Sequence, residues 1–536
     1  MTDIEISRSS KKIKIKEVAE GINIGFDELV LYGDYKEKIK KEISNADGKL
    51  ILVTAISPTP MGEGKTTVSI GLGDALNKIG KKTIITLREP SMGPVFGIKG
   101  GATGGGYSQV VPMEDINLHF TGDFHAITSA NNLISAAIDN HIYFDNKLDI
   151  QKVLFNRCLD MNDRALRLVN LGNRVDKFSI SSASEVMALF CLATSLQNLR
   201  ERLGNIVIGV NSKNEFIYLR QLNIEGSLLA LLKDAFMPNL VQTLENTPTI
   251  IHGGPFANIA HGCNSIIATK LALSNANYVV TEAGFGADLG AEKFFDIKCR
   301  LGNLEPDCVV LVATIKALKY HGGVKKEDIF KENEYSLKKG FANLDKHYNN
   351  LKKFGVNVIV CLNKFDSDLD SEIKIFEDYC KNKDYVYSIS NAYELGSNGA
   401  IDLANKVISN QKSNFKLLYE LDESLENKIR KVCCEIYGAK SVEFNEISKE
   451  KIHLLEENNI TNLPICVAKT QYSFSDDKNK VGVPEDFIVT VKDINLYSGA
   501  GFITVLLGDI MTMPGLSRNP NYEVIDVIDG EIVNLS

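Results

Sequence analysis

The stretch Thr59-Pro60-Met61-Gly62-Glu63-Gly64-Lys65-Thr66 follows the apolar run at 50–53 and precedes a helical pattern. A strand, a glycine-rich loop and a helix in this order are typical of a loop that binds nucleotide phosphates, because its backbone N–H groups point at the anion. In such a loop Lys65 reaches the β and γ phosphate oxygens and the Thr66 hydroxyl faces Mg²⁺. The first position departs from the usual pattern, since Thr59 replaces glycine and Pro60 stiffens the turn. We predict an ATP or GTP site, with an ordinary strand-to-helix turn as the alternative.

Length, charge and cysteine content narrow the class of protein. The 536 residues allow two to four domains at ~100–200 residues per domain. The net charge is −8 and the basic residues are scattered, so no nucleic-acid-binding surface is expected. No apolar run approaches the ~18 residues of a membrane span, and the ten cysteines contain no C-x-x-C pair. We therefore expect a cytoplasmic protein whose partners are small molecules rather than nucleic acid or membrane.

Short β-branched runs alternate with helical stretches along most of the chain. This alternation predicts an α/β fold, a mostly parallel sheet covered by helices like that of phosphate-loop nucleoside triphosphatases (NTPases), together with two smaller domains. We place the domains at 1–345, 346–470 and 471–536, the first carrying the nucleotide site. The ligand crevice of such a sheet lies beyond the carboxyl ends of its strands, so the residues that follow the strands should converge. The expected strands are 50–54, 83–87, 206–210, 249–251, 278–282, 308–313, 356–362 and 385–389.

Arg88 directly follows the expected strand 83–87 and lies one strand-helix unit beyond Lys65. Its planar guanidinium is suited to a carboxylate or phosphate, although a surface salt bridge with Glu89 is the alternative. Residues 96–107 then include six glycines. This much backbone freedom favours a loop that closes over a ligand rather than regular structure.

Histidines cluster at two places. Asp123 and His125 lie just before an expected helix at 126–139, where an acid-base pair and a simple helix cap are both reasonable interpretations. His252 follows another expected strand and His261 lies nearby, which suits either a crevice lining or buried structural histidines.

Two further motifs are poor matches to their usual functions. Residues 284–290 have the spacing G-x-G-x-x-x-G, which is weak evidence for a dinucleotide. Residues 363–366 read Asn-Lys-Phe-Asp, the guanine selector of GTPases, but the chain contains no D-x-x-G switch. Adenine is therefore the expected base.

Taken together, these segments resemble formate–tetrahydrofolate ligases along nearly the whole chain. The resemblance implies ATP-dependent joining of formate to tetrahydrofolate, Mg²⁺ bound with ATP, a monovalent cation such as K⁺ or NH₄⁺, and a homotetramer. It also implies a phosphate-loop domain with two smaller domains. The segments that carry it are 32–39, 54–67, 88–94, 96–134, 252–266, 282–300, 313–323, 469–477 and 508–518.

The resemblance also implies roles for single residues. Residues 59–66 match the family's ATP loop, and Arg88 matches the arginine that holds a formyl phosphate intermediate. Phe365 falls where an aromatic ring packs on the pterin, and Tyr393 stands where tryptophan is common. Tyr393 still offers a flat face, in a chain that contains no tryptophan.

The expected reaction has two steps. Formate attacks the γ-phosphorus of ATP to give formyl phosphate and ADP, and N10 of the folate then displaces phosphate. Lys65 and Arg88 neutralise charge in both steps, and either Asp123 or His125 removes the amine proton. A regulatory phosphate-loop ATPase and an inactive paralogue that binds folate or nucleotide are the alternatives.

Overall fold

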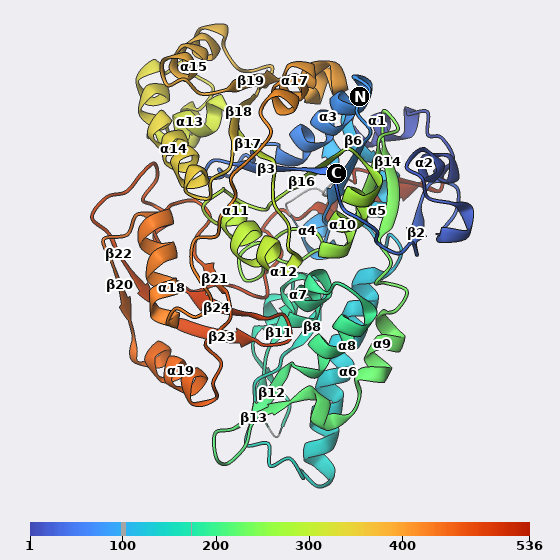
Figure 1. Ribbon diagram of the computed structural model, residues 1–536, viewed down its shortest axis with the longest axis vertical. Coiled ribbons are helices and arrows are strands. Elements are labelled where there is room, and N and C mark those ends of the chain that lie inside the picture. Colours follow the sequence, from blue (N-terminus) through green and yellow to red (C-terminus); the bar gives the residue numbers. More distant parts are fainter. Residues whose placement is uncertain (98–102, 173, 536) are drawn as a thin grey trace.

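The computed structural model describes residues 1–97, 103–172 and 174–535, and it shows an α/β fold built on a large, mostly parallel mixed sheet (Figure 1). The seven strands from β15 to β19 along the sheet pair in parallel, and the opposite end is antiparallel. In spatial order the main path is β1 (Leu29–Leu31), β2 (Glu37–Ile39), β14 (Asn239–Thr243), β15 (Pro248–Ile251), β4 (Thr83–Leu87), β16 (Tyr278–Glu282), β3 (Lys49–Ala55), β17 (Cys308–Ala313), β18 (Val358–Asn363) and β19 (Tyr387–Ser390).

The central strands are continuous apolar runs because helices cover both of their faces. Along β3, Leu50 and Leu52 join the hydrophobic cluster on one face, whereas Ile51 and Val53 join the cluster on the other. The predicted strands at 83–87, 278–282 and 308–313 coincide with β4, β16 and β17.

Each face of the sheet has its own helices. The helices α3 (Lys65–Lys78) and α17 (Ile401–Ser409) pack on the Ile51 face. Ten consecutive residues of α3, from Thr67 to Leu76, are buried. Glycines permit this close packing, because a Cβ on Gly71 would lie 2.3 Å from the Cβ of Ala392. The opposite face is covered by α10 (Ile266–Asn275), α13 (Ile315–His321), α14 (Glu334–Lys353) and α15 (Asp370–Asn382).

A second, mainly helical body adjoins the sheet (Figure 1). It contains α6, predicted at 126–139 but observed at Asp123–Phe144, and its core includes apolar residues from the C-terminal part of the chain. Its other helices are α7 (Glu185–Leu192), α8 (Leu196–Gly204) and α9 (Glu225–Leu232).

One predicted strand lies outside the main sheet. The run predicted at 206–210 forms β12 (Val207–Val210), which pairs in antiparallel fashion with β13 (Phe216–Tyr218) and β7 (Lys152–Val153). Its end therefore does not join the carboxyl edge of the main sheet, and that expectation was wrong. An apolar run predicts a strand but does not specify the sheet to which the strand belongs.

Strand pairing crosses both predicted domain boundaries. The runs predicted at 356–362 and 385–389 form β18 and β19 and extend the main sheet beyond residue 345, which lies inside α14. Near residue 470, β21 (Ile465–Ala468) pairs with β24 (Phe502–Leu506), and β24 also pairs with β23 (Asp493–Tyr497). The division into three domains stays a prediction.

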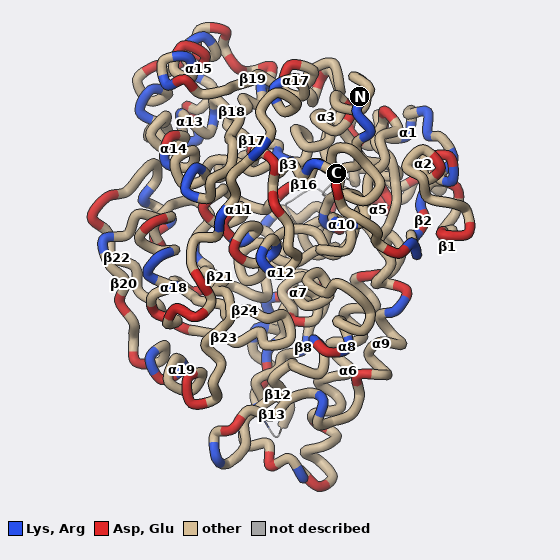
Figure 2. Tube along the Cα trace, viewed as in Figure 1, with Lys and Arg blue, Asp and Glu red and all other residues tan. Residues whose placement is uncertain are grey.

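Basic and acidic residues are interspersed over the tube (Figure 2). Among the described residues, no helix is long and apolar enough to cross a membrane.

The glycine-rich segment predicted to close over a ligand lies partly outside the described residues, at 98–102. Its described end forms β5 (Gly104–Gly105), which pairs with β6 (Ser108–Val111).

Candidate functional site

The carboxyl ends of the parallel strands meet at one edge of the sheet. Because β16 lies between β4 and β3, the ends of these three strands bring Arg88, Glu282 and the loop at 59–66 to neighbouring positions. The next strands on the other side of β3 end close to Lys316 and Phe365. This is the crevice position in which α/β sheets bind ligands.

The loop at 59–66 has the backbone of an anion-binding turn. Gly62 and Gly64 have φ of +78° and +70°, a region that glycine adopts without strain. The Thr59 N–H donates to Glu63 Oε1 at 2.6 Å, so a buried carboxylate already occupies one amide of the loop. Helix α3 begins at Lys65, and the N–H groups of its first turn lack intrahelical partners by geometry. Because these amides and the Lys65 ammonium are all hydrogen-bond donors, they indicate an anion as the ligand.

Asn363 supports this loop from the side. Its Nδ2 donates to the Glu63 carbonyl at 3.0 Å, and a Cβ on Gly64 would lie 2.3 Å from the same nitrogen. Asn363 is the first residue of the segment that resembles a guanine selector. In this structure its amide therefore braces the loop.

The Thr66 hydroxyl donates to Glu282 Oε2 at 2.9 Å. Glu282 is the last residue of β16 and is buried. Hydroxyl and carboxylate oxygens are ligands that Mg²⁺ accepts. Glu282 was not predicted as a site residue from the sequence. The signal that could have identified it is a carboxylate at the end of an apolar strand.

Arg88 is half-buried and lies on the far side of β16 from the loop. Its Nη1 donates to the Pro255 carbonyl at 3.3 Å, and its buried Nε has no hydrogen-bond partner within the described part of the chain. A Cβ on Gly284 would lie 3.3 Å from Nη2, so the glycine at this turn leaves room for the guanidinium. The motif that resembles a dinucleotide turn thus flanks Arg88.

Asp123 is held in a buried ion pair. Its Oδ1 accepts from Lys38 Nζ and its Oδ2 from Asn239 Nδ2, each at 2.7 Å. Burial raises the pKa of Asp123, and the nearby Lys38 ammonium opposes this shift. The pair therefore fixes the start of α6 beside Glu89, whose pKa is raised well above its usual range by burial and by Asp123.

The histidines divide into exposed and buried groups. His125 is exposed on the first turn of α6, and the structure leaves its predicted role as a base untested. His252 is buried between the Ser265 hydroxyl at 2.7 Å and the Ala235 carbonyl at 2.9 Å, and burial lowers its pKa to about 3. His261 is also fully buried. His252 therefore has the contacts of a structural histidine.

The two predicted pterin contacts follow β18 and β19. Phe365 is half-buried, and Lys316 Nζ lies 4.0 Å from its ring centroid. Tyr393 is 45 % exposed, and its hydroxyl donates to Asp3 Oδ1 at 3.4 Å. Burial, Asp3 and, more weakly, Asp366 raise the pKa of Tyr393, so the turn that carries Phe365 lies within electrostatic reach of Tyr393.

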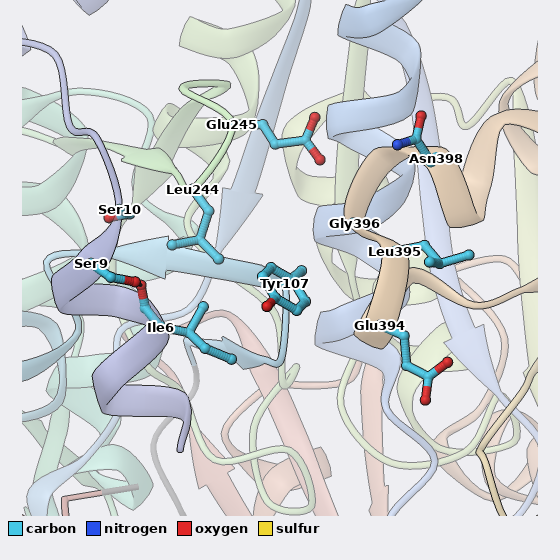
Figure 3. Close-up of a pocket in the computed structure, with 10 residues that line it drawn as sticks. All are labelled: Ile6, Ser9, Ser10, Tyr107, Leu244, Glu245, Glu394, Leu395, Gly396 and Asn398. Atoms are coloured by element: carbon cyan, nitrogen blue, oxygen red, sulfur yellow. The ribbon is translucent and has the colours of Figure 1, made fainter. Parts of the chain in front are cut away.

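A cavity of about 520 Å³ is lined in part by Glu394, Leu395, Gly396 and Asn398, which follow Tyr393 in the sequence (Figure 3). Tyr107 lies between the N-terminal helix α1 (Asp3–Ser9) on one side and residues 394–398 on the other. The Tyr107 N–H donates to the Tyr393 carbonyl at 2.7 Å. The lining includes Glu245 and Glu394 and no residue of the loop at 59–66, so this cavity is separate from the anion-binding edge.

A comparison with protein-family models matches residues 1–536 to the family described as "Formate--tetrahydrofolate ligase". The match covers the whole chain, including the loop at 59–66, Arg88, Phe365 and Tyr393.

Proposed function

Because the chain belongs to the formate–tetrahydrofolate ligase family and is a ligase, we propose that it joins formate to tetrahydrofolate at the expense of ATP, through a formyl phosphate intermediate. The observation that supports this proposal most strongly is the Thr66–Glu282 contact at 2.9 Å, with Arg88 on the other side of β16. A cationic side chain and two oxygen-bearing side chains thus follow the ends of three neighbouring strands. Phosphoryl transfer requires this kind of positioning and charge neutralisation.

In the proposed first step, a formate oxygen attacks the γ-phosphorus of ATP and ADP leaves. The loop at 59–66 holds the phosphates through its backbone N–H groups and the Lys65 ammonium, except at Thr59, whose N–H binds Glu63, and at Pro60, which has no N–H. Arg88 binds the formyl phosphate that forms. In the second step N10 attacks the formyl carbon, phosphate leaves, and Asp123 or His125 accepts the amine proton. Phe365 and Tyr393 stack on the pterin.

Two cations fit side chains of this site. Thr66 and Glu282 would hold the Mg²⁺ that accompanies ATP, which supplies further charge neutralisation. Glu89 has a buried Oε2 without a hydrogen-bond partner in the described residues, which fits a monovalent cation as the missing ligand. We further propose a homotetramer in the cytoplasm, on the family resemblance alone.

The direct test is an assay with ATP, Mg²⁺, K⁺, formate and tetrahydrofolate, followed by acidification and detection of methenyl-folate absorbance. Product should depend on each substrate. A folded sample that forms no product, or that hydrolyses ATP without formate and folate, would reject the proposal.

Lys65→Ala tests the loop itself. Loss of a charge that stabilises a transition state costs ~10²–10³-fold or more in kcat, so turnover should be abolished while circular dichroism is unchanged. Lys78→Ala is the matched control, since Lys78 is on the same helix and binds Asn398 Oδ1 at 2.6 Å. Activity of Lys65→Ala within threefold of the parent protein would reject this assignment.

A further inference from the structure

Ser57 lies between β3 and the loop at 59–66, and three buried side chains bind its polar atoms. Its N–H donates to Asn343 Oδ1 at 3.3 Å, and its Oγ accepts from Asn343 Nδ2 at 3.1 Å. The same Oγ lies 3.0 Å from His347 Nε2, and the Ser57 carbonyl lies 2.9 Å from His321 Nε2. Every polar atom of Ser57 is therefore used, which fixes the chain where it enters the loop.

Two of these directions follow from the groups involved. Ser57 Oγ accepts from the Asn343 amide, while the donor in its 3.0 Å contact with His347 Nε2 depends on the tautomer of that imidazole. His321 must donate from Nε2 to the Ser57 carbonyl. The His321 imidazole is then neutral, because its Nδ1 accepts from the Gly482 N–H. Burial lowers the pKa of His321 to about 4 and that of His347 to about 3.

The same side chains bind the C-terminal part of the chain. Asn343 Nδ2 also donates to the Gly482 carbonyl at 2.9 Å, and the Gly482 N–H donates to His321 Nδ1 at 3.3 Å. Phe474 packs on the His347 ring with centroids 4.6 Å apart. Two side chains thus connect Gly482 directly to Ser57, although 425 residues of sequence separate them.

The other end of this C-terminal segment approaches Ser57 by a second route. Lys469 Nζ pairs with Asp288 Oδ2 at 2.7 Å, and both residues are buried. In the turn that carries Asp288, the Ala287 N–H donates to the Ala55 carbonyl at 2.8 Å, and a Cβ on Gly286 would lie 3.3 Å from the Ser57 Cα. Residues 469–482 are therefore anchored on both sides of Ser57.

We propose that Asn343, with His321 and His347, is a positioning group that sets the geometry of the loop at 59–66 and makes residues 469–482 an indirect part of the nucleotide site. The inference rests on the proposed function, because it requires that this loop binds ATP. None of these side chains needs to touch the nucleotide. They act through Ser57, whose displacement shifts the loop and the Lys65 ammonium that follows it.

Asn343→Ala tests the link, with Asn350→Ala as its matched control. Asn350 is buried on the same helix α14 and donates to the Ile436 carbonyl at 2.7 Å, so its loss removes a similar buried hydrogen bond away from the loop. We expect Asn343→Ala to weaken ATP binding about tenfold by calorimetry and to lower kcat by up to ~10²-fold, the scale of a 1 Å misplacement. Binding of tetrahydrofolate should stay within twofold in both variants.

Gly482→Ala tests the contribution of the C-terminal segment. Its Cβ would lie 2.8 Å from the His321 carbonyl at a φ of +79°. Gly530→Ala is the control, because Gly530 has a φ of +82° and open space around the added Cβ. Gly482→Ala should weaken ATP binding at least fivefold more than Gly530→Ala does.

The inference fails if Asn343→Ala and Asn350→Ala change ATP affinity equally, or if Gly482→Ala matches Gly530→Ala. These results are distinct from failure of the proposed function. If the proposed function itself were wrong, the parent protein would form no product, or Lys65→Ala would retain activity.

Discussion

Arg88 presents a planar guanidinium next to the edge proposed to bind phosphates, on the opposite side of β16 from Lys65. We expect Arg88→Ala to keep ATP affinity within a few fold by calorimetry, because its proposed ligand is the intermediate. Turnover should fall by ~10³-fold or more, the scale of arginines that stabilise phosphoryl transfer. Arg88→Lys should not restore activity, since an ammonium lacks the bidentate fork. Equal losses of ATP binding and turnover in Arg88→Ala would instead place Arg88 in the nucleotide site.

Asp74 is a buried carboxylate on α3 that accepts a hydrogen bond from Thr243 Oγ1 at 2.6 Å. Burial raises its pKa from 3.8 to about 7. Below pH 3.8 the Asp74 carboxyl is neutral in both the folded and the unfolded protein. As the pH rises to 7, it ionises only in the unfolded chain, so Asp74 progressively destabilises the folded state. This destabilisation stops increasing once the pH exceeds the pKa that Asp74 has in the folded state.

We therefore expect Asp74→Asn, which stays neutral, to gain stability relative to the parent protein as the pH rises. The difference between the two proteins in free energy of unfolding should shift by about 3 kcal/mol in favour of the variant between pH 5 and pH 8, at 1.36 kcal/mol per pKa unit. Urea unfolding at both pH values measures this shift. A difference that does not change with pH would show that Asp74 has an ordinary pKa.

At the scale of elements, the turns after β18 and β19 carry the aromatic groups proposed for the pterin. Lys316 covers one face of Phe365 at 4.0 Å from the ring centroid, which leaves the opposite face for stacking. Phe365→Ala should raise the KM for tetrahydrofolate roughly tenfold, since stacking on an aromatic ring is worth ~1–3 kcal/mol per base. The Kd for ATP should stay unchanged. Phe365→Leu is the control. A normal KM for tetrahydrofolate in Phe365→Ala would show that the Phe365 ring is not part of the folate site.

The sequence predicted most of the strands well because the formation of a strand depends on local order. The run at 83–87, the glycines at 62 and 64, and Arg88 directly after a strand all lie where their neighbours in sequence place them. The partners of these features come from elsewhere in the chain. Asn363 braces Gly64, and Glu282 binds Thr66 across 216 residues, contacts that no local pattern specifies.

The site was also harder to predict where one residue type serves two purposes. His252 was a candidate for the lining of the crevice, yet the Ser265 hydroxyl and the Ala235 carbonyl account for both of its ring nitrogens. The sequence shows the same letter for a buried carboxylate or imidazole whether its role is catalytic or structural. Only the surrounding donors and acceptors distinguish the two roles.

At the scale of the whole molecule, the main sheet continues past the boundary predicted at 345. A fragment of residues 1–345 would end inside α14 and would expose β17 where β18 now pairs. An unpaired strand edge promotes aggregation. We expect this fragment to aggregate on gel filtration, whereas residues 1–411, which keep β18, β19 and α17, should remain more soluble. A soluble, cooperatively unfolding 1–345 fragment would establish an independent first domain.

The burial of α3 along ten consecutive residues limits how the molecule can move. A helix that packs closely on β4 and on residue 392 through its glycines has little room to rotate or slide when a ligand binds. Its amide hydrogens should be among the slowest in the chain to exchange with solvent. A protein that signals its nucleotide state needs a segment that the γ-phosphate can order or release. The rigidity of α3 instead suits a fixed template, in which the substrates arrive and leave while the phosphate-binding frame stays still.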